Sequence, residues 1–289
     1  FSLAYSTVAQ PGMSYFGDRD GFIAFGSKMG RFFALGDPLA DHDNHAVLIE
    51  DFVRSGRDPW FVQIGEATAR TLAALGYRVN RLGVDTHLNL PGHDFSGRAG
   101  ATVRYSERWL LRQGYAFVED DGTGRLAEID DLSFEWRSTR VVSRWEMTFL
   151  NRPFAARLGP DMRRFLLLGP DRRISALLDC DPLFRDGRVR GYTTAFKRKR
   201  PDATAHAEVG LTKFMVDRMR EEGAAVVTLG LSPLASLQPS GFAESHFWRR
   251  AFQSAHDSTL VNRLKFNLKG QSAFKRRFHG AEVPSSIAF

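Results

Sequence analysis

Residues 207–236 constrain the fold more than any other stretch of this sequence. They read AEVGLTKFMVDRMREEGAAVVTLGLSPLAS. Apolar residues recur at three- and four-residue spacings from Leu211 to Met219, which predicts a helix with one buried face. Gly223 suits a helix end, and the uncharged aliphatic run 226–231 is typical of a strand covered on both faces. Ser232-Pro233 then predicts an abrupt exit from that strand, because proline lacks the N–H that a ladder needs.

The rest of the chain predicts a mixed α/β fold. Residues 13–40 read as two or three short antiparallel strands, and residues 60–84 as strand, helix and strand. The second half repeats the first half's succession of three strands, a helix and a strand, with its strands beginning near residue 162. We therefore expect mixed sheets with helices packed on them, in two units of residues 1–150 and 151–289.

Composition restricts the class of protein and its partners. A single cysteine, Cys180, excludes an internal disulfide framework and fits a reducing compartment. No apolar run approaches the roughly 20 residues that a membrane helix needs. Residues 1–150 carry 16 Lys and Arg against 20 Asp and Glu, whereas residues 151–289 carry 24 against 13. The basic second half favours a polyanionic partner, either a nucleic acid or an anionic lipid surface, over the alternative of an Arg-rich soluble protein.

Two basic segments are the candidates for binding a nucleic acid. The run 197–200 precedes the predicted helix, and the tail from residue 260 interleaves cations with phenylalanines and contains no acid before residue 282. Cations hold phosphates and aromatic rings stack on bases, although the phenylalanines alone are explained equally well as core residues. The predicted nucleic-acid-binding residues are Lys197, Arg198, Lys199, Arg200, Arg263, Lys265, Lys269, Phe274, Arg276 and Arg277.

Several short motifs occur along the chain in a fixed order: Ala34-Leu35-Gly36-Asp37-Pro38, the strand 60–64 with the following helix and Gly76, Val103-Arg104 with Gly114, the stretch 229–234, and Gly270 with Phe274-Lys275 and Phe278. Together they resemble the C-terminal domain of bacterial phosphatidylglycerol lysyltransferases and alanyl-phosphatidylglycerol synthases. The resemblance covers nearly the whole chain and implies two tandem acetyltransferase-like (GNAT) domains related to the Fem peptidyltransferases. Such enzymes move an aminoacyl group from aminoacyl-tRNA to an acceptor hydroxyl or amine.

The resemblance implies aminoacyl-tRNA as a co-substrate, no further cofactor, and a phosphatidylglycerol-type lipid as the first-choice acceptor. Lys275 is then the candidate cation near the tRNA 3′ end or the oxyanion, and Leu231 and Ser232 line the substrate pocket. Glu208 or His206 serves as base or as clamp for the amino acid's ammonium group, unless Glu208 only caps its helix. The family's Asp-Leu-Met-Arg and Met-Asp motifs are absent, which leaves the acceptor less certain than the donor.

Three alternatives remain open at this stage. The acceptor could be a small soluble metabolite, the donor could be acetyl-CoA, or the chain could be a basic module that binds RNA or a membrane surface without turnover. A glycine-rich pyrophosphate loop is not found ahead of the helix at Ala207, which counts against acetyl-CoA. Asp85, His87, His93 and Asp94 lack the spacing of a structural zinc site, and no metal is expected. We expect a cytoplasmic location, which is compatible with peripheral contact to the inner face of the membrane.

Overall fold

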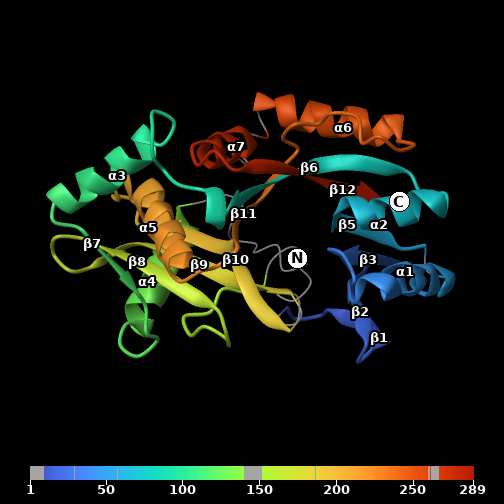
Figure 1. The fold of residues 1–289 in the computed structure, drawn as a ribbon, viewed down its shortest axis with the longest axis horizontal. Helices are drawn as coiled ribbons and strands as arrows, with labels where there is room; N and C mark the ends of the chain where they lie inside the picture. The colour runs from blue at the N-terminus through green and yellow to red at the C-terminus, as the bar shows by residue number, and fades with distance from the viewer. Residues whose placement is uncertain are drawn as a thin grey trace.

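A computed structural model describes residues 10–28, 30–56, 58–139, 152–185, 187–259, 261 and 267–289. Its strands form one mixed sheet with the order β1-β2-β3-β5-β12-β6-β11-β10-β9-β8-β7, and β4 pairs with β2 (Figure 1). The strands are β1 (Ser14–Asp18), β2 (Gly21–Lys28), β3 (Arg31–Leu35), β4 (Leu39–Ala40), β5 (Trp60–Ile64), β6 (Val79–Asn89), β7 (Ala116–Glu119), β8 (Arg163–Leu168), β9 (Ile174–Arg185), β10 (Arg188–Lys199), β11 (Val226–Pro233) and β12 (Ala281–Ala288). The helices are α1 (His45–Arg54), α2 (Glu66–Ala74), α3 (Ala101–Arg112), α4 (Leu126–Ser138), α5 (Ala207–Glu221), α6 (His246–Asp257) and α7 (Leu268–Arg276). The predicted α/β class with a mixed sheet is confirmed.

The same strand succession occurs twice in this sheet. β1, β2 and β3 form an antiparallel meander, and α1 crosses over to β5, which runs parallel to β3. β8, β9 and β10 form a second meander, and α5 crosses over to β11, which runs parallel to β10. Both β6 and β12 lie between the two repeats, where they pair with each other. The repeat that the sequence predicted is therefore present in the strand order.

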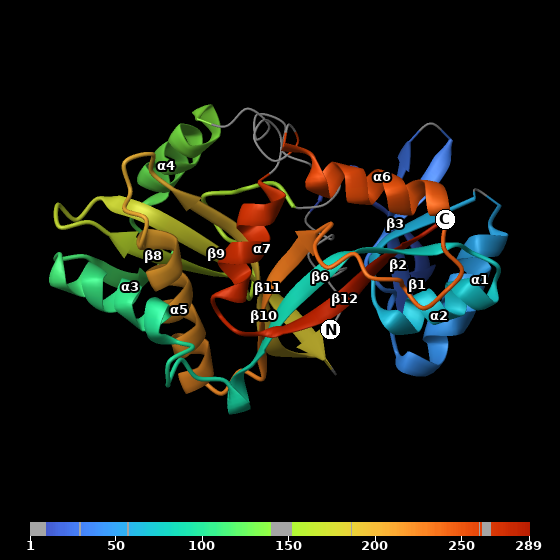
Figure 2. The same cartoon turned by 90° about the horizontal axis from the view of Figure 1, so that it is seen from above.

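Helices cover both faces of the second repeat (Figures 1 and 2). Phe165 and Leu167 of β8 belong to the core under α3 and α5, whereas Leu166 and Leu168 belong to the core under α4. Alternate residues of a strand point to opposite faces, so β8 lies between two apolar layers and reads as an uninterrupted hydrophobic run. A third core forms where α1 and α2 pack on the first repeat.

The local predictions for α5 and β11 hold with two changes. α5 begins at Ala207 and is followed by Gly223 at φ +81°. It is buried around more than the one predicted face, because α3 packs on it as well as the sheet, and Gly210 and Lys213 are buried in addition to Met215. β11 starts at Val226 but continues through Pro233, two residues beyond the predicted end. The proline is tolerated because the backbone of β11 remains extended there opposite Gly83 of β6.

Other boundaries differ from the sequence-based expectation. The predicted division at residues 150 and 151 lies outside the described residues. Helix α3 packs on α5, and β7 pairs with β8, so residues 101–119 join the second repeat in space. The acidic stretch 119–131 reads in the sequence as an exposed loop followed by a helix from about Leu132. α4 instead starts at Leu126, because Ile129 and Leu132 together form the apolar face that packs against β8.

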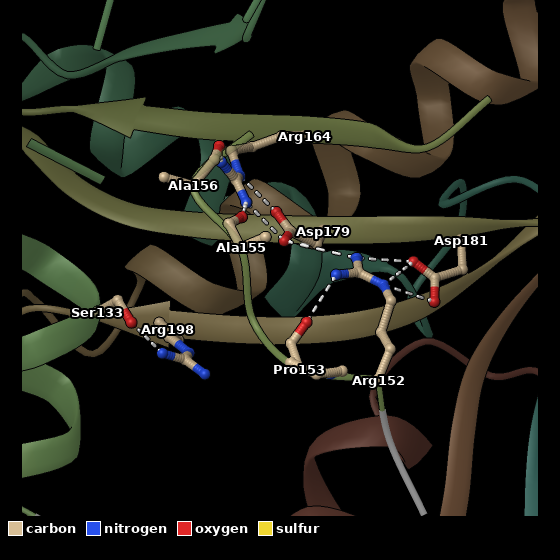
Figure 3. Close-up of polar contacts among 9 residues, drawn as sticks. All are labelled: Ser133, Arg152, Pro153, Ala155, Ala156, Arg164, Asp179, Asp181 and Arg198. Atoms are coloured by element: carbon tan, nitrogen blue, oxygen red, sulfur yellow. Dashed lines mark hydrogen bonds and ion pairs between the residues drawn. The ribbon is translucent and has the colours of Figure 1, made fainter. Parts of the chain in front are cut away.

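Two buried arginine–aspartate pairs fix the segment after residue 151 to the sheet (Figure 3). Arg164 and Asp179 are fully buried, with Nε–Oδ1 and Nη2–Oδ2 distances of 2.6 and 2.8 Å. Arg164 also donates to the carbonyl oxygens of Ala155 and Ala156. Arg152 donates to Asp181 at 2.8 Å. Each carboxylate is thus matched by a guanidinium fork, which is the geometry that a buried ion pair requires.

Replacing Asp179 with alanine is expected to lower the free energy of unfolding by about 3–5 kcal/mol, because Arg164 is left buried without its counter-charge. Urea denaturation followed by circular dichroism measures this loss. Glu66→Ala is the control, since its carboxylate pairs with Arg70 on the surface and its removal should cost less than about 1 kcal/mol. A loss at Asp179 as small as the control's would contradict the assigned role.

Candidate functional site

An irregularity in β11 creates the candidate site. The pairing register between β11 and β6 shifts between Thr228 and Leu231, and Gly230 adopts φ +76° within that interval. On the other side, the parallel pairing of β11 with β10 ends at Thr228 and Thr193. Beyond this point both strands continue without pairing to each other. The carbonyl groups of β11 that would bond to a neighbouring strand are therefore open to a different donor.

Lys275 of α7 supplies that donor. Its Nζ donates to the carbonyl oxygens of Gly230 and Leu231, at 2.6 and 2.7 Å. Gly230 reaches this backbone conformation without the steric cost that a β-carbon would add. The predicted catalytic lysine and the predicted substrate-pocket residue Leu231 thus meet directly. Ser232 follows in β11, and its side chain is almost completely buried.

The ammonium group of Lys275 is in an unusual environment. The residue is 9% exposed, and burial lowers the pKa of its side chain from 10.5 to about 8, with the Asp85 carboxylate acting in the opposite direction. An ammonium group has three donors, of which two point at carbonyl oxygens. One donor is left for a ligand. The cation is thereby held in a fixed place with a pKa close to neutral, which is typical of functional sites.

Helix α7 connects the two strands that have separated. Asn267 caps its first turn by accepting from the backbone N–H of Gly270. Lys197 of β10 lies over the ring of Phe274, with Nζ 3.2 Å from the ring centroid. Phe278, one turn past Phe274, is fully buried in the core under α3 and α5. The main role of Phe274 and Phe278 is therefore packing, which is the alternative explanation that the sequence offered for these phenylalanines.

Asp85 and His87 were considered in the sequence only as metal ligands, yet β6 places them beside Lys275. Asp85 pairs with Leu231 in the β-ladder, and His87 pairs with Thr228, so both flank the irregular part of β11. Their side chains approach each other, with 3.7 Å between Nε2 and Oδ2. The only sequence signal for this arrangement is that Asp85 and His87 are two residues apart and directly follow the strand predicted to end at residue 84. Alternate residues of a strand share one face of the sheet. Within the described residues no group of three or more His, Cys, Asp and Glu could hold a metal ion.

The other two predicted catalytic residues lie on a different part of the second repeat. Glu208 faces Lys199 at the end of β10, with 3.4 Å between Oε2 and Nζ. His206 precedes α5, where its Nδ1 is 3.1 Å from the Ser106 hydroxyl and its ring lies 4.8 Å from that of Trp109. Both therefore make contacts that hold α5 to β10 and α3. Neither has a hydrogen bond or ion pair with Lys275 among the interactions of the described residues.

The basic run before α5 divides into buried and accessible cations. Arg198 is 2% exposed and donates to Ser133 (Figure 3). Its guanidinium group also lies 4.0 Å from the ring centroid of Phe154. Arg200 is 4% exposed and donates to the carbonyl oxygen of Ile174. Both arginines follow the alternation of β10 into the core under α4. Lys197 and Lys199 are partly exposed on the other face.

The predicted tail cations lie mainly on the surface of α7. Lys269, Arg276 and Arg277 are exposed, and Arg276 forms an ion pair with Glu282 at 3.1 Å. Arg263 and Lys265 lie outside the described residues. The sequence had not predicted a helix here, because the apolar positions of the tail fit a terminal strand equally well.

Comparison with known proteins assigns the family. Residues 1–289 match the family described as "Phosphatidylglycerol lysyltransferase, C-terminal". The chain belongs to this family. It is 22% identical over 268 residues to the phosphatidylglycerol lysyltransferase of Bacillus subtilis (strain 168), covering 90% of this chain and 30% of that protein. The resemblance stated from the sequence motifs is confirmed, and the chain spans less than a third of the curated relatives that it matches.

Solved structures share the fold of this family member. The structure of L-PGS from Bacillus licheniformis superposes with a TM-score of 0.77 at 20% identity, covering 100% of this chain and 87% of that one. A C-terminal domain assigned to a lysylphosphatidylglycerol synthetase of Agrobacterium fabrum gives a TM-score of 0.75 at 23% identity, covering 96% and 83%. At these sequence identities the structural similarity shows a shared fold and nothing further. None of the described helices combines the length and apolar character needed to cross a bilayer.

A stability experiment tests the site of this family member without reference to activity. The side chain of Lys275 has a pKa of about 8 when folded and an ordinary value of 10.5 when exposed. Between these pH values the unfolded state binds more protons, so raising the pH favours folding. Relative to Lys275→Met, the wild type is expected to gain about 3 kcal/mol of unfolding free energy across this window. Parallel urea titrations at several pH values measure the difference, and a pH-independent difference would contradict the buried-ammonium assignment.

Proposed function

We propose that this chain is the catalytic part of an aminoacyltransferase that moves an amino acid from aminoacyl-tRNA to a phosphatidylglycerol-type lipid. The observation that carries the proposal is the Lys275 ammonium, held at the β11 carbonyl oxygens with one donor to spare. Membership of the phosphatidylglycerol lysyltransferase family supports the choice of a lipid acceptor. The name of the Bacillus subtilis relative supports the same choice.

The chemistry requires little more than positioning and one well-placed cation. An aminoacyl ester is already activated, so no covalent intermediate with the protein is needed. The acceptor hydroxyl oxygen attacks the ester carbonyl carbon, a new ester bond forms, and the bond to the terminal ribose oxygen of tRNA breaks. That ribose oxygen receives the proton that the acceptor gives up. Lys275 would donate its remaining N–H to the carbonyl oxygen as negative charge develops there.

The end of β10 and the start of α5 favour tRNA over acetyl-CoA as donor. Residues 200–206, RPDATAH, contain no glycine, although close approach of a backbone to a pyrophosphate usually depends on one. Glu208 also places an acid in the first turn of α5, which opposes an anion at that helix end. The roles first suggested for Glu208 and His206 are secondary in this proposal, because their side chains are engaged with Lys199 and Ser106.

The exposed cations of α7 are proposed to hold the tRNA. Lys269 and Arg277 lie on the helix that carries Lys275, so phosphates bound there would bring the tRNA 3′ end towards the site. Lys197 and Lys199 extend the same positive surface along β10. A cytoplasmic location at the inner face of the membrane follows from a tRNA donor and a lipid acceptor. The two strand repeats are proposed to be tandem acetyltransferase-like domains.

The decisive experiment uses a set of tRNAs, each charged with one radiolabelled amino acid, and vesicles containing phosphatidylglycerol. Label from at least one tRNA is expected in the lipid-extractable fraction, and Lys275→Ala is expected to reduce the rate at least about a hundredfold, as loss of an oxyanion donor does. Lys28→Ala, which removes an exposed lysine in β2, is the matched control. Label only in water-soluble product would indicate a metabolite acceptor, and consumption of acetyl-CoA without tRNA deacylation would refute the proposal.

The pH dependence tests the role of Lys275 as a cation. Because its pKa is about 8, the ammonium donor is lost as the pH rises through that value. The single-turnover transfer rate, corrected for spontaneous ester hydrolysis, is expected to fall above pH 8. A rate that instead rises through the same value would assign Lys275 the role of a base.

The tRNA surface is tested through the salt dependence of binding. Arg277→Gln is expected to weaken tRNA binding and to reduce the slope of log affinity against log salt by about one phosphate contact. Arg19→Gln, which removes an exposed arginine next to β1, should leave both quantities unchanged. Equal effects of the two substitutions would remove α7 from the binding surface.

A further inference from the structure

Asp85 lies next to the Lys275 site through the ladder of β6. It is opposite Leu231 of β11 on one side and opposite Val283 of β12 on the other. Leu231 provides one of the two carbonyl oxygens that hold Lys275. Residues directly opposite in neighbouring strands place their side chains on the same face. The carboxylate is therefore at the centre of the sheet, where the two repeats meet.

The Asp85 carboxylate has fewer partners than its burial calls for. The side chain is 13% exposed, and its Oδ1 is buried without a hydrogen-bond donor. The 3.7 Å separation of Oδ2 from His87 Nε2 is too long for a hydrogen bond. No ion pair joins Asp85 to Lys275 within the described part of the chain, and two of the three lysine N–H groups point to β11 carbonyl oxygens instead.

Two other buried carboxylates of the sheet have the hydrogen-bond partners that Asp85 lacks. Asp179 and Asp181 each accept from a guanidinium group, and Asp179 does so with both oxygens. A buried carboxylate without such partners costs free energy, and an incoming cation that supplies the missing donors recovers it. Within the described part of the chain, Asp85 interacts with the Lys275 cation only at a distance, and no donor reaches its buried Oδ1, so the carboxylate can accept from an incoming cation.

We propose that Asp85 binds the α-ammonium group of the aminoacyl ester, an inference that rests on the proposed function. An α-aminoacyl ester carries a positive nitrogen attached to the carbon next to its reacting carbonyl. The site offers charges in the matching arrangement, with a carboxylate for the ammonium and the Lys275 donor for the carbonyl oxygen. Glu208, the first candidate for this clamp, already faces Lys199. His87, opposite Thr228, borders the same ligand position.

A binding experiment tests the inference without turnover. The probe is adenosine whose 3′ position carries an alanyl group through an amide, which cannot be transferred; its partner is the lactyl analogue, with a hydroxyl in place of the amine. The wild type is expected to bind the alanyl compound about tenfold to a hundredfold more tightly by calorimetry, as an ionic hydrogen bond implies. Asp85→Asn should reduce this preference to within about twofold.

Control variants separate an ammonium clamp from a structural role. Asp94→Asn removes an exposed carboxylate and should keep the full preference. Asp85→Glu retains the charge and should keep part of it. If the wild type binds both compounds equally, binds neither, or keeps its preference in a folded Asp85→Asn protein, the inference is overturned. These outcomes are independent of whether any charged tRNA transfers its amino acid to lipid, which is the separate test of the proposed function.

Discussion

The ammonium group of Lys275 and the two carbonyl oxygens of β11 form the interaction on which the centre of this molecule depends. β11 leaves regular pairing at Gly230, and β10 turns away from it at the same level. A sheet interrupted on both sides would normally leave backbone oxygens unpaired in a buried place. Lys275 of α7 donates hydrogen bonds to two of these backbone oxygens, and it thereby also places a positive charge beside β11. The irregular part of the sheet is in this way the place of the proposed binding site.

Two groups of buried charges in one sheet differ in how completely they are neutralised. The arginine and aspartate pairs under residues 152–156 match donors to acceptors and hold a segment of chain in place. Around Lys275 and Asp85 the matching is incomplete, and each group keeps capacity for a partner. Structural ion pairs cost least when every lone pair is satisfied, whereas a site for a charged substrate must keep some unsatisfied. This contrast, which depends on no relative, is the physical basis for proposing the Lys275 and Asp85 region as the functional part of the sheet.

The sequence predicted those parts of the fold whose signals are local. α5 and the start of β11 follow from apolar spacing, a terminal glycine and an aliphatic run, and Lys275 followed from a motif resemblance. Asp85 was considered in the sequence only as a metal ligand and set aside, because its position beside Lys275 comes from pairing with β11, about 150 residues away in sequence. Arg198 and Arg200 read as surface cations until the alternation of β10 buried them. The positions of these three side chains are determined by strand pairing between distant parts of the chain, which composition does not reveal.

The placement of β12 has a consequence for how the protein is made. This strand, residues 281–288, lies between β5 and β6, although those two strands belong to the first third of the chain. During synthesis the edges of β5 and β6 that pair with β12 stay unpaired until residues 281–288 have left the ribosome. Exposed strand edges attract other strands during that delay. Folding of the sheet therefore ends with a late step, in which β12 pairs with β5 and β6. Chaperones that shield exposed strand edges are expected to assist folding before that step.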